Sequence, residues 1–244
     1  MASPLFWLGY FAVIFTSTII QSTLGFGFNI FGLIFLTQLF DSYPQAVAMC
    51  STLCLFTTAS LAIRLRQYIN WRILAPCTVG YFLSLPIAIH LSVTLEKDLL
   101  MRLLGGFLIL LSIYFITIGN RIRIRPTTRN GLIAGLIGGI LSGLFGIGGP
   151  PVVIYFLSSL NEKNPYMATL QTSLTITGIY ALIVRAMNGL FTAEMVGQFA
   201  VGTAAFAVGS VIGYRILKRI PLELMRKLIY ALMIVSGVKM VLGL

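Results

Sequence analysis

Two glycine clusters are the feature of this sequence with the clearest chemical potential. The first is Gly25-Phe26-Gly27, and the second is Gly146-Ile147-Gly148-Gly149, which runs directly into Pro150-Pro151. Each lies inside a long apolar run, where glycine allows a turn and proline starts a new helix rather than continuing the old one. A helix N-terminus offers free N–H groups and a partial positive charge, so it can bind an oxyanion without a charged side chain. The clusters therefore predict an anion site built from two helix N-termini.

Polar side chains at a similar depth could complete the coordination of such an anion. Ser51 and Thr52 lie roughly 10–12 Å into the helix expected after Pro44. The predicted substrate-binding set consists of Gln21, Gly25, Gly27, Asn29, Ser51, Thr52, Gly146, Gly148, Gly149, Gln171, Thr172 and Ser173. The competing interpretation is structural: glycines allow close helix packing, and Ser and Thr hydroxyls bond to the preceding turn.

Two arginines, Arg64 and Arg185, are predicted at helix ends. They could recruit anions at the two mouths of a transport pathway, or they could anchor the helices at the membrane surface. No Lys or Arg is predicted at the centre of the site.

Groups that would support other chemistry are missing from the apolar runs. All six acidic residues fall in or beside loops, and His90 is the only histidine. The three cysteines, Cys50, Cys54 and Cys77, lie within apolar runs, and their spacing is not that of metal ligands. We expect them to be small buried hydrophobic residues. We therefore predict no catalytic residue, no metal site and no cofactor, and a membrane-embedded enzyme is disfavoured. A carboxylate that could carry a coupling proton across the membrane is not predicted either.

The composition identifies the environment of these residues. Of 244 residues, 58 % are hydrophobic and only 9 % are charged, whereas soluble domains carry roughly 25 % charged residues. The net charge of +11 does not indicate nucleic-acid binding, because Lys and Arg lie in short loops between apolar runs, which is the positive-inside pattern. The chain is predicted to be an all-α integral membrane protein.

The apolar runs form two similar halves. A shift of 121 residues places Gly25 on Gly146, Gly27 on Gly148 and Arg64 on Arg185. The first repeat is predicted at 1–120, with a hairpin at 4–40 and helices at 46–63, 73–95 and 103–119. The second is predicted at 121–244, with a linker at 121–129, a hairpin at 131–160 and helices at 167–184, 195–214 and 228–244.

The basic residues favour a topology in which each long run enters and leaves on one side, as a re-entrant hairpin. Of 17 Lys and Arg residues, 13 then face the cytoplasm, and only Lys97, Arg102, Arg185 and Lys239 face out. If each long run crosses once, the bias disappears. One hairpin and three crossings per half make the two repeats inverted, with both termini periplasmic. Inverted repeats with broken helices that meet at the midplane are typical of transporters.

These motifs also carry a family resemblance. The sequence resembles the sulfite exporter TauE/SafE family of bacterial membrane proteins over nearly its whole length. The most specific element is the segment 143–151, with 21–29 as its first-half copy. Phe28 and Asn29 stand where the second half has Gly149 and Pro150, so the half-sites are unequal. The resemblance implies outward transport of sulfur oxyanions or organosulfonates.

The predicted function is export of sulfur-containing anions, such as sulfite, thiosulfate or sulfoacetate, across a bacterial inner membrane. The expected partners are the small anionic substrate and the lipid bilayer, and nucleic acid is not expected. Whether the chain forms a homodimer is left open. Two alternatives stay open: a cation or Na⁺-coupled transporter, in which unwound backbone carbonyls bind the ion, and a membrane assembly subunit that transports nothing.

Overall fold

The computed structural model describes residues 4–37, 40, 42–117, 125–160, 162–193 and 195–221, together with single positions beyond them. Within these residues the chain is helical and contains no strand. The helices are α1 (Pro4–Leu24), α2 (Phe28–Leu36), α3 (Tyr43–Arg64), η1 (Arg66–Tyr68), α4 (Trp71–Thr94), α5 (Lys97–Thr117), α6 (Thr128–Phe145), α7 (Gly149–Ser159), α8 (Lys163–Met187) and α9 (Met195–Arg219). Most of the helix expected at 228–244, and 121–124 of the expected linker, lie outside the described residues.

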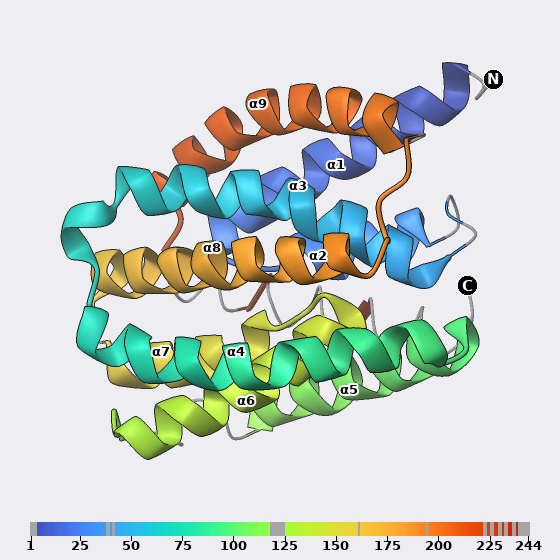
Figure 1. The fold of residues 1–244 in the computed structure, drawn as a ribbon. Coiled ribbons are helices and arrows are strands. Elements are labelled where there is room, and N and C mark those ends of the chain that lie inside the picture. The colour runs from blue at the N-terminus through green and yellow to red at the C-terminus, as the bar shows by residue number, and fades with distance from the viewer. Residues whose placement is uncertain are drawn as a thin grey trace.

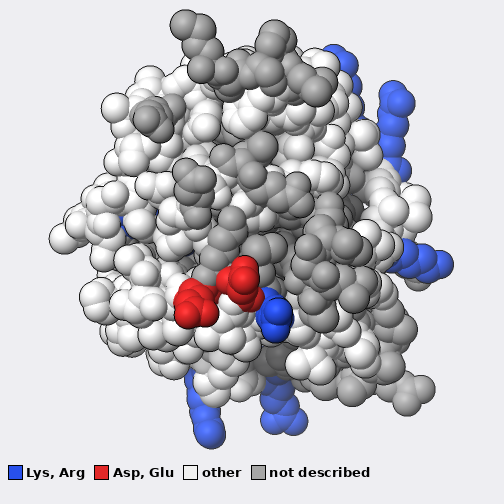
Figure 2. Space-filling view, turned by 90° about the vertical axis from the view of Figure 1, so that its right-hand side faces the viewer, with Lys and Arg blue, Asp and Glu red and all other residues white. Residues whose placement is uncertain are grey.

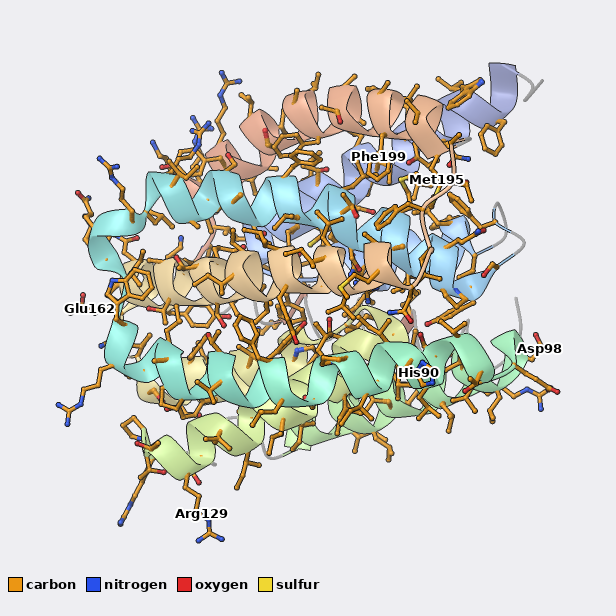
Figure 3. All side chains as sticks on the ribbon, in the orientation of Figure 1. His90, Asp98, Arg129, Glu162, Met195 and Phe199 are labelled. Atoms are coloured by element: carbon orange, nitrogen blue, oxygen red, sulfur yellow. The ribbon has the colours of Figure 1, made fainter. Side chains whose placement is uncertain are left out.

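Six described helices, α1, α3, α4, α6, α8 and α9, are long and apolar enough to cross a membrane. Large apolar side chains on their outer faces are exposed, as Ile87 of α4 is at 73 %. The charged side chains labelled in Figure 3 lie at the ends of the bundle, Arg129 and Glu162 at one end and Asp98 at the other. Figure 2 looks onto this second end, where acidic side chains lie together and most visible Lys and Arg side chains protrude at the rim. The prediction of an all-α multi-pass membrane protein is therefore confirmed.

Each long apolar run is broken into a long and a short helix at its glycine cluster. Between α1 and α2, Gly25 and Gly27 adopt φ values of +86° and +109°, which residues with a Cβ rarely adopt. Between α6 and α7, Gly146 ends α6 with φ of +69°, and its N–H bonds to the carbonyls of Leu141 and Ser142. Pro150 and Pro151 occupy the first turn of α7, where their missing N–H groups break no helical hydrogen bond.

The two broken segments open toward opposite ends of the bundle. In Figure 1, α1 and α2 both reach the right-hand end, where α3 begins, whereas α6 starts and α7 finishes at the left-hand end, where α8 begins. The two glycine turns therefore both lie inside the bundle.

Helix packing around the turns follows a paired pattern. Helix α4 packs along α6, α9 packs along α1, and α3 packs against α8. Small residues make the first two contacts close: a Cβ on Gly135 or Gly143 of α6 would overlap the α4 backbone, and a Cβ on Gly209 of α9 would lie 2.9 Å from the Phe15 carbonyl oxygen of α1. A hydroxyl-to-carbonyl hydrogen bond spans each pair, from Ser84 to Leu136 (2.8 Å) and from Thr23 to Gly213 (3.3 Å).

Several helices extend beyond the apolar runs that predicted them. Helix α8 begins at Lys163 and continues to Met187, and α5 begins at Lys97 rather than at 103. A charge interrupts an apolar run but does not break a helix, which continues until a capping residue or turn ends it.

Candidate functional site

A cavity of about 70 Å³ lies where the two glycine turns meet α3, α4 and α8. This volume has room for several water molecules, and polar groups from both halves of the chain line it. The sequence-predicted residues in its wall are Gln21, Gly27, Asn29, Ser51, Gly146, Gly148, Gly149 and Arg185.

The turns are held by reciprocal hydrogen bonds between the two halves. Asn29 of α2 donates from Nδ2 to the Gly146 carbonyl in the second turn and to Ser51 Oγ of α3 (3.1 Å). Gln171 of α8 donates from Nε2 to the Gly25 carbonyl in the first turn (2.7 Å). Gln21 Nε2 donates to that same carbonyl (3.1 Å). Each glycine turn is therefore fixed by a side-chain amide from the opposite half.

Several other predicted residues do not line the cavity. The Thr52 hydroxyl donates to the Ala48 carbonyl one turn earlier (2.8 Å), which is the structural alternative for this residue. Thr172 and Ser173 are buried but do not form part of the cavity wall, and neither does Gly25.

The two short helices offer fewer free N–H groups than the sequence argument assumed. At α2, the Phe28 N–H already donates to Gln21 Oε1 (3.2 Å). At α7, Pro150 and Pro151 have no N–H, which leaves the N–H groups of Gly148 and Gly149 at this terminus. Side chains must therefore supply much of any anion coordination.

Gly148 differs from the other turn glycines in what it requires. Its φ of −80° is open to any residue, so its backbone conformation does not explain a glycine here. The lack of space explains it, because a Cβ at this position would lie 2.6 Å from the Gly138 carbonyl oxygen and 2.8 Å from the Tyr81 hydroxyl.

The structure corrects the position assigned to Arg185. The residue lies near the end of α8, but its side chain points inward, is only 2 % exposed and lines the cavity. Its Nη2 donates to the Ser142 carbonyl of α6 (2.7 Å). Arg185 therefore does not sit at a mouth, and the expectation that no cationic side chain reaches the centre is wrong. Its helical spacing could have revealed this, because Leu174, Gly178, Ala181 and Arg185 form one stripe of α8 that faces the cavity.

The cavity combines this guanidinium with neutral polar groups. The Tyr81 hydroxyl of α4 is within hydrogen-bonding reach of Ser142 and Thr177, and all three line the wall, although the sequence analysis missed them. Ser142 could have been found, since the 121-residue shift places it on Gln21. The acidic side chains that the structure describes, Glu96, Asp98 and Glu162, are all exposed, and none lines the cavity.

Arg64 and two of the three cysteines lie away from this cavity. Arg64 is at the end of α3, where its guanidinium carbon lies 4.9 Å from the centre of the Tyr214 ring. Cys54 contributes to the cavity wall, and Cys50 and Cys77 are buried elsewhere. Over the described ranges, His, Cys, Asp and Glu do not gather into a group that could hold a metal ion.

Comparison with known proteins identifies a family and a similar protein. The family described as "Sulfite exporter TauE/SafE" matches residues 10–240. A protein of Cupriavidus necator, named "Probable sulfite/organosulfonate exporter TauE", is 26 % identical over 220 residues, which cover 85 % of this chain and 83 % of that protein. No solved structure matches the chain.

Proposed function

The chain belongs to the sulfite exporter TauE/SafE family, whose members are membrane transporters rather than enzymes, and we propose that it exports small sulfur-containing anions through the cavity between its glycine turns. The names of the family and of the similar protein of Cupriavidus necator give sulfite and organosulfonates as the substrate class. We extend the proposal to thiosulfate and, among the organosulfonates, to sulfoacetate.

The burial of Arg185 in the cavity wall is the observation that favours an anion as the substrate. A guanidinium stays protonated at any physiological pH, and its burial without a carboxylate is costly. Among the described residues its one hydrogen-bond acceptor is the neutral Ser142 carbonyl, which leaves N–H donors for another acceptor. An anion in the cavity would neutralise this charge, whereas a cation would be repelled by it. The alternative of a cation transporter is disfavoured for the same reason.

Neutral donors could complete the anion's coordination. The Ser51 hydroxyl accepts a hydrogen bond from Asn29, so its own proton is free to point at a ligand. The N–H groups of Gly148 and Gly149 lie at the start of α7, where the helix dipole is positive. We propose two roles within the full predicted binding set. Some residues contact the anion, and others, such as Gln171, hold the glycine turns in place.

The paired packing supports two inverted repeats, at 1–120 and 121–244. Under the 121-residue shift, the α4–α6 contact corresponds to α9–α1, and α3–α8 corresponds to itself. The hairpins also open toward opposite ends (Figure 1). Such a two-fold arrangement allows the site to face each side in turn, by rocking of one repeat against the other.

Contacts at one end of the bundle support the hairpin topology. Arg64 contacts Tyr214, and Lys163 Nζ donates to the Leu217 carbonyl (2.6 Å), so the loops after α3, before α8 and after α9 share one end. If the long apolar runs crossed once, the first two of these loops would lie on opposite faces. From the positive-inside rule we propose that this end lies in the cytoplasm and that both termini lie in the periplasm of a bacterial inner membrane.

Efflux of labelled anions from proteoliposomes tests the proposal. We expect sulfite, thiosulfate or sulfoacetate to leave faster than from protein-free vesicles, and Na⁺ or K⁺ not to move. Arg185→Met should abolish efflux, and Arg185→Lys should retain part of it. Arg129→Met is the matched control, because Arg129 is exposed at the end of the bundle (Figure 3).

Two outcomes would refute the proposal. A monodisperse, well-inserted wild-type protein that moves none of these anions would favour the assembly-subunit alternative. Efflux unchanged in Arg185→Met would remove the cavity from the transport route.

A further inference from the structure

A second, larger cavity lies at the end of the bundle where α3 and α9 end and α8 begins. Its volume is about 450 Å³, and three cationic residues line it: Arg64, Lys163 and Lys218. None of the acidic residues that the structure describes belongs to its wall. In Figure 3, nitrogen-tipped side chains gather at this end of α3 and α9. Its electrostatics therefore favour an anion.

Tyr214 holds two of these cations near each other. The Arg64 guanidinium carbon and the Lys218 ammonium nitrogen each lie 4.9 Å from the centre of its ring. Attraction between cation and ring offsets part of the repulsion between the two charges. The described residues give neither cation a hydrogen-bond acceptor, so both have donors free for a ligand.

Lys163 has a different arrangement. Its ammonium donates to the carbonyls of Leu217 (2.6 Å) and Ile220 (3.3 Å), at the C-terminal end of α9. Two of its three donors are used there, and the positive charge stays in the wall of the cavity. It also compensates the partial negative charge at this helix end.

Met167 separates this cavity from the first glycine turn. It lines the outer cavity, and a Cβ built on Gly25 would lie 2.9 Å from its sulfur atom. Gln171, one helical turn further along α8, donates to the Gly25 carbonyl. The methionine side chain is unbranched and flexible, so it can move aside without displacing a helix.

From this arrangement we infer that the outer cavity is a second anion-binding site, at which Arg64 and Lys218 capture the transported oxyanion before it passes Met167 to reach the cavity of Arg185. The inference rests on the proposed function. It assigns different tasks to the two arginines that the repeat places in register: Arg185 binds at the centre, and Arg64 binds at the surface.

Binding stoichiometry tests the inference directly. Equilibrium dialysis of the detergent-purified full chain with radiolabelled sulfite should give two equivalents for the wild type and one for Arg64→Gln/Lys218→Gln. Arg185→Met should also retain one, at the outer site. The matched control is Arg66→Gln/Arg215→Gln, which removes two exposed cations from the same end, neither of which lines the cavity. It should keep both equivalents.

Transport provides a second readout. In phosphatidylcholine vesicles, Arg64→Gln/Lys218→Gln should raise the half-saturating sulfite concentration roughly tenfold, the effect of two charges at about 5 Å in water. The maximal rate should not change. Because these charges are exposed, salt should raise the wild-type value toward that of the variant.

Three results would overturn the inference. One is a single equivalent in the wild type that Arg185→Met removes and Arg64→Gln/Lys218→Gln leaves; the proposed function would then survive alone. Another is a response of the control pair equal to that of Arg64→Gln/Lys218→Gln. The third is loss of bound phosphatidylglycerol in Arg64→Gln/Lys218→Gln with both sulfite equivalents kept, which would assign the cavity to a lipid phosphate.

Discussion

Two adjacent glycines at the anion cavity can each be replaced by alanine. Comparing the two variants would show whether glycine is needed there for lack of space or for its backbone flexibility. Gly148 and Gly149 both lie at the start of α7 and both line the cavity. A Cβ on Gly148 would lie 2.6 Å from the Gly138 carbonyl oxygen, whereas a Cβ on Gly149 would meet its nearest neighbour, Phe26 Cβ, at 3.4 Å. The first distance demands movement of the α6 backbone, and the second is an ordinary contact.

The expected magnitudes follow from these distances. Overpacking costs about 1–3 kcal/mol, so the apparent melting temperature of Gly148→Ala should fall by about 2–12 °C, on the scale of soluble chains of this size. If the same free energy is lost from anion binding, the half-saturating concentration should rise roughly 5- to 150-fold. Gly149→Ala should leave both quantities at the wild-type value, or stabilise α7 slightly, because alanine favours helices.

Thermal unfolding in detergent and initial efflux rates in proteoliposomes measure the two quantities. Equal behaviour of the two alanine variants would refute the steric reasoning, because only Gly148 has a backbone oxygen within the forbidden distance. Gly148→Leu extends the test: its side chain would enter a cavity of only about 70 Å³. We expect it to abolish transport while the protein still inserts, and Gly27→Leu to act similarly.

Three further predictions test topology, driving force and the inter-repeat hydrogen bonds. A single cysteine at Asn188 should react with an impermeant thiol reagent on intact cells, and one at Lys218 only after permeabilisation; the reverse pattern would contradict the inverted repeats. Efflux should accelerate when the interior is negative. A dianion that leaves the vesicle gains about 4.6 kcal/mol at 100 mV, enough for a roughly 2000-fold concentration gradient. An efflux rate that is independent of the potential but follows a pH gradient at constant substrate protonation would count against this prediction. Asn29→Ala removes the side-chain donor to the Gly146 carbonyl and to Ser51. We expect a loss of about 1–3 kcal/mol in the free energy of unfolding, together with slower transport. A melting temperature equal to the wild-type value would show that this amide does not hold the turn.

The sequence was sufficient for the membrane helices and for the positions of their breaks. A chain with 9 % charged residues cannot cover a water-facing surface, and helices in lipid must satisfy their own backbone hydrogen bonds. Glycine clusters within long apolar runs therefore marked the turns, because few other residues adopt the positive φ that Gly25, Gly27 and Gly146 show. The family resemblance rested on these same local motifs, and the family match confirmed it.

Which polar groups meet was decided by the tertiary structure. Periodicity gives the depth of a residue along a helix, but not the neighbour that its side chain reaches. Arg185 follows the last apolar residue of its run and looked like a surface anchor. Only the tertiary arrangement brings the Ser142 carbonyl, near the end of α6, within reach of its guanidinium. Its repeat mate Arg64 instead contacts Tyr214, because α9 passes the end of α3. The same residue type at matched sequence positions thus has two environments, since a side chain's surroundings depend on which helices pack against its own.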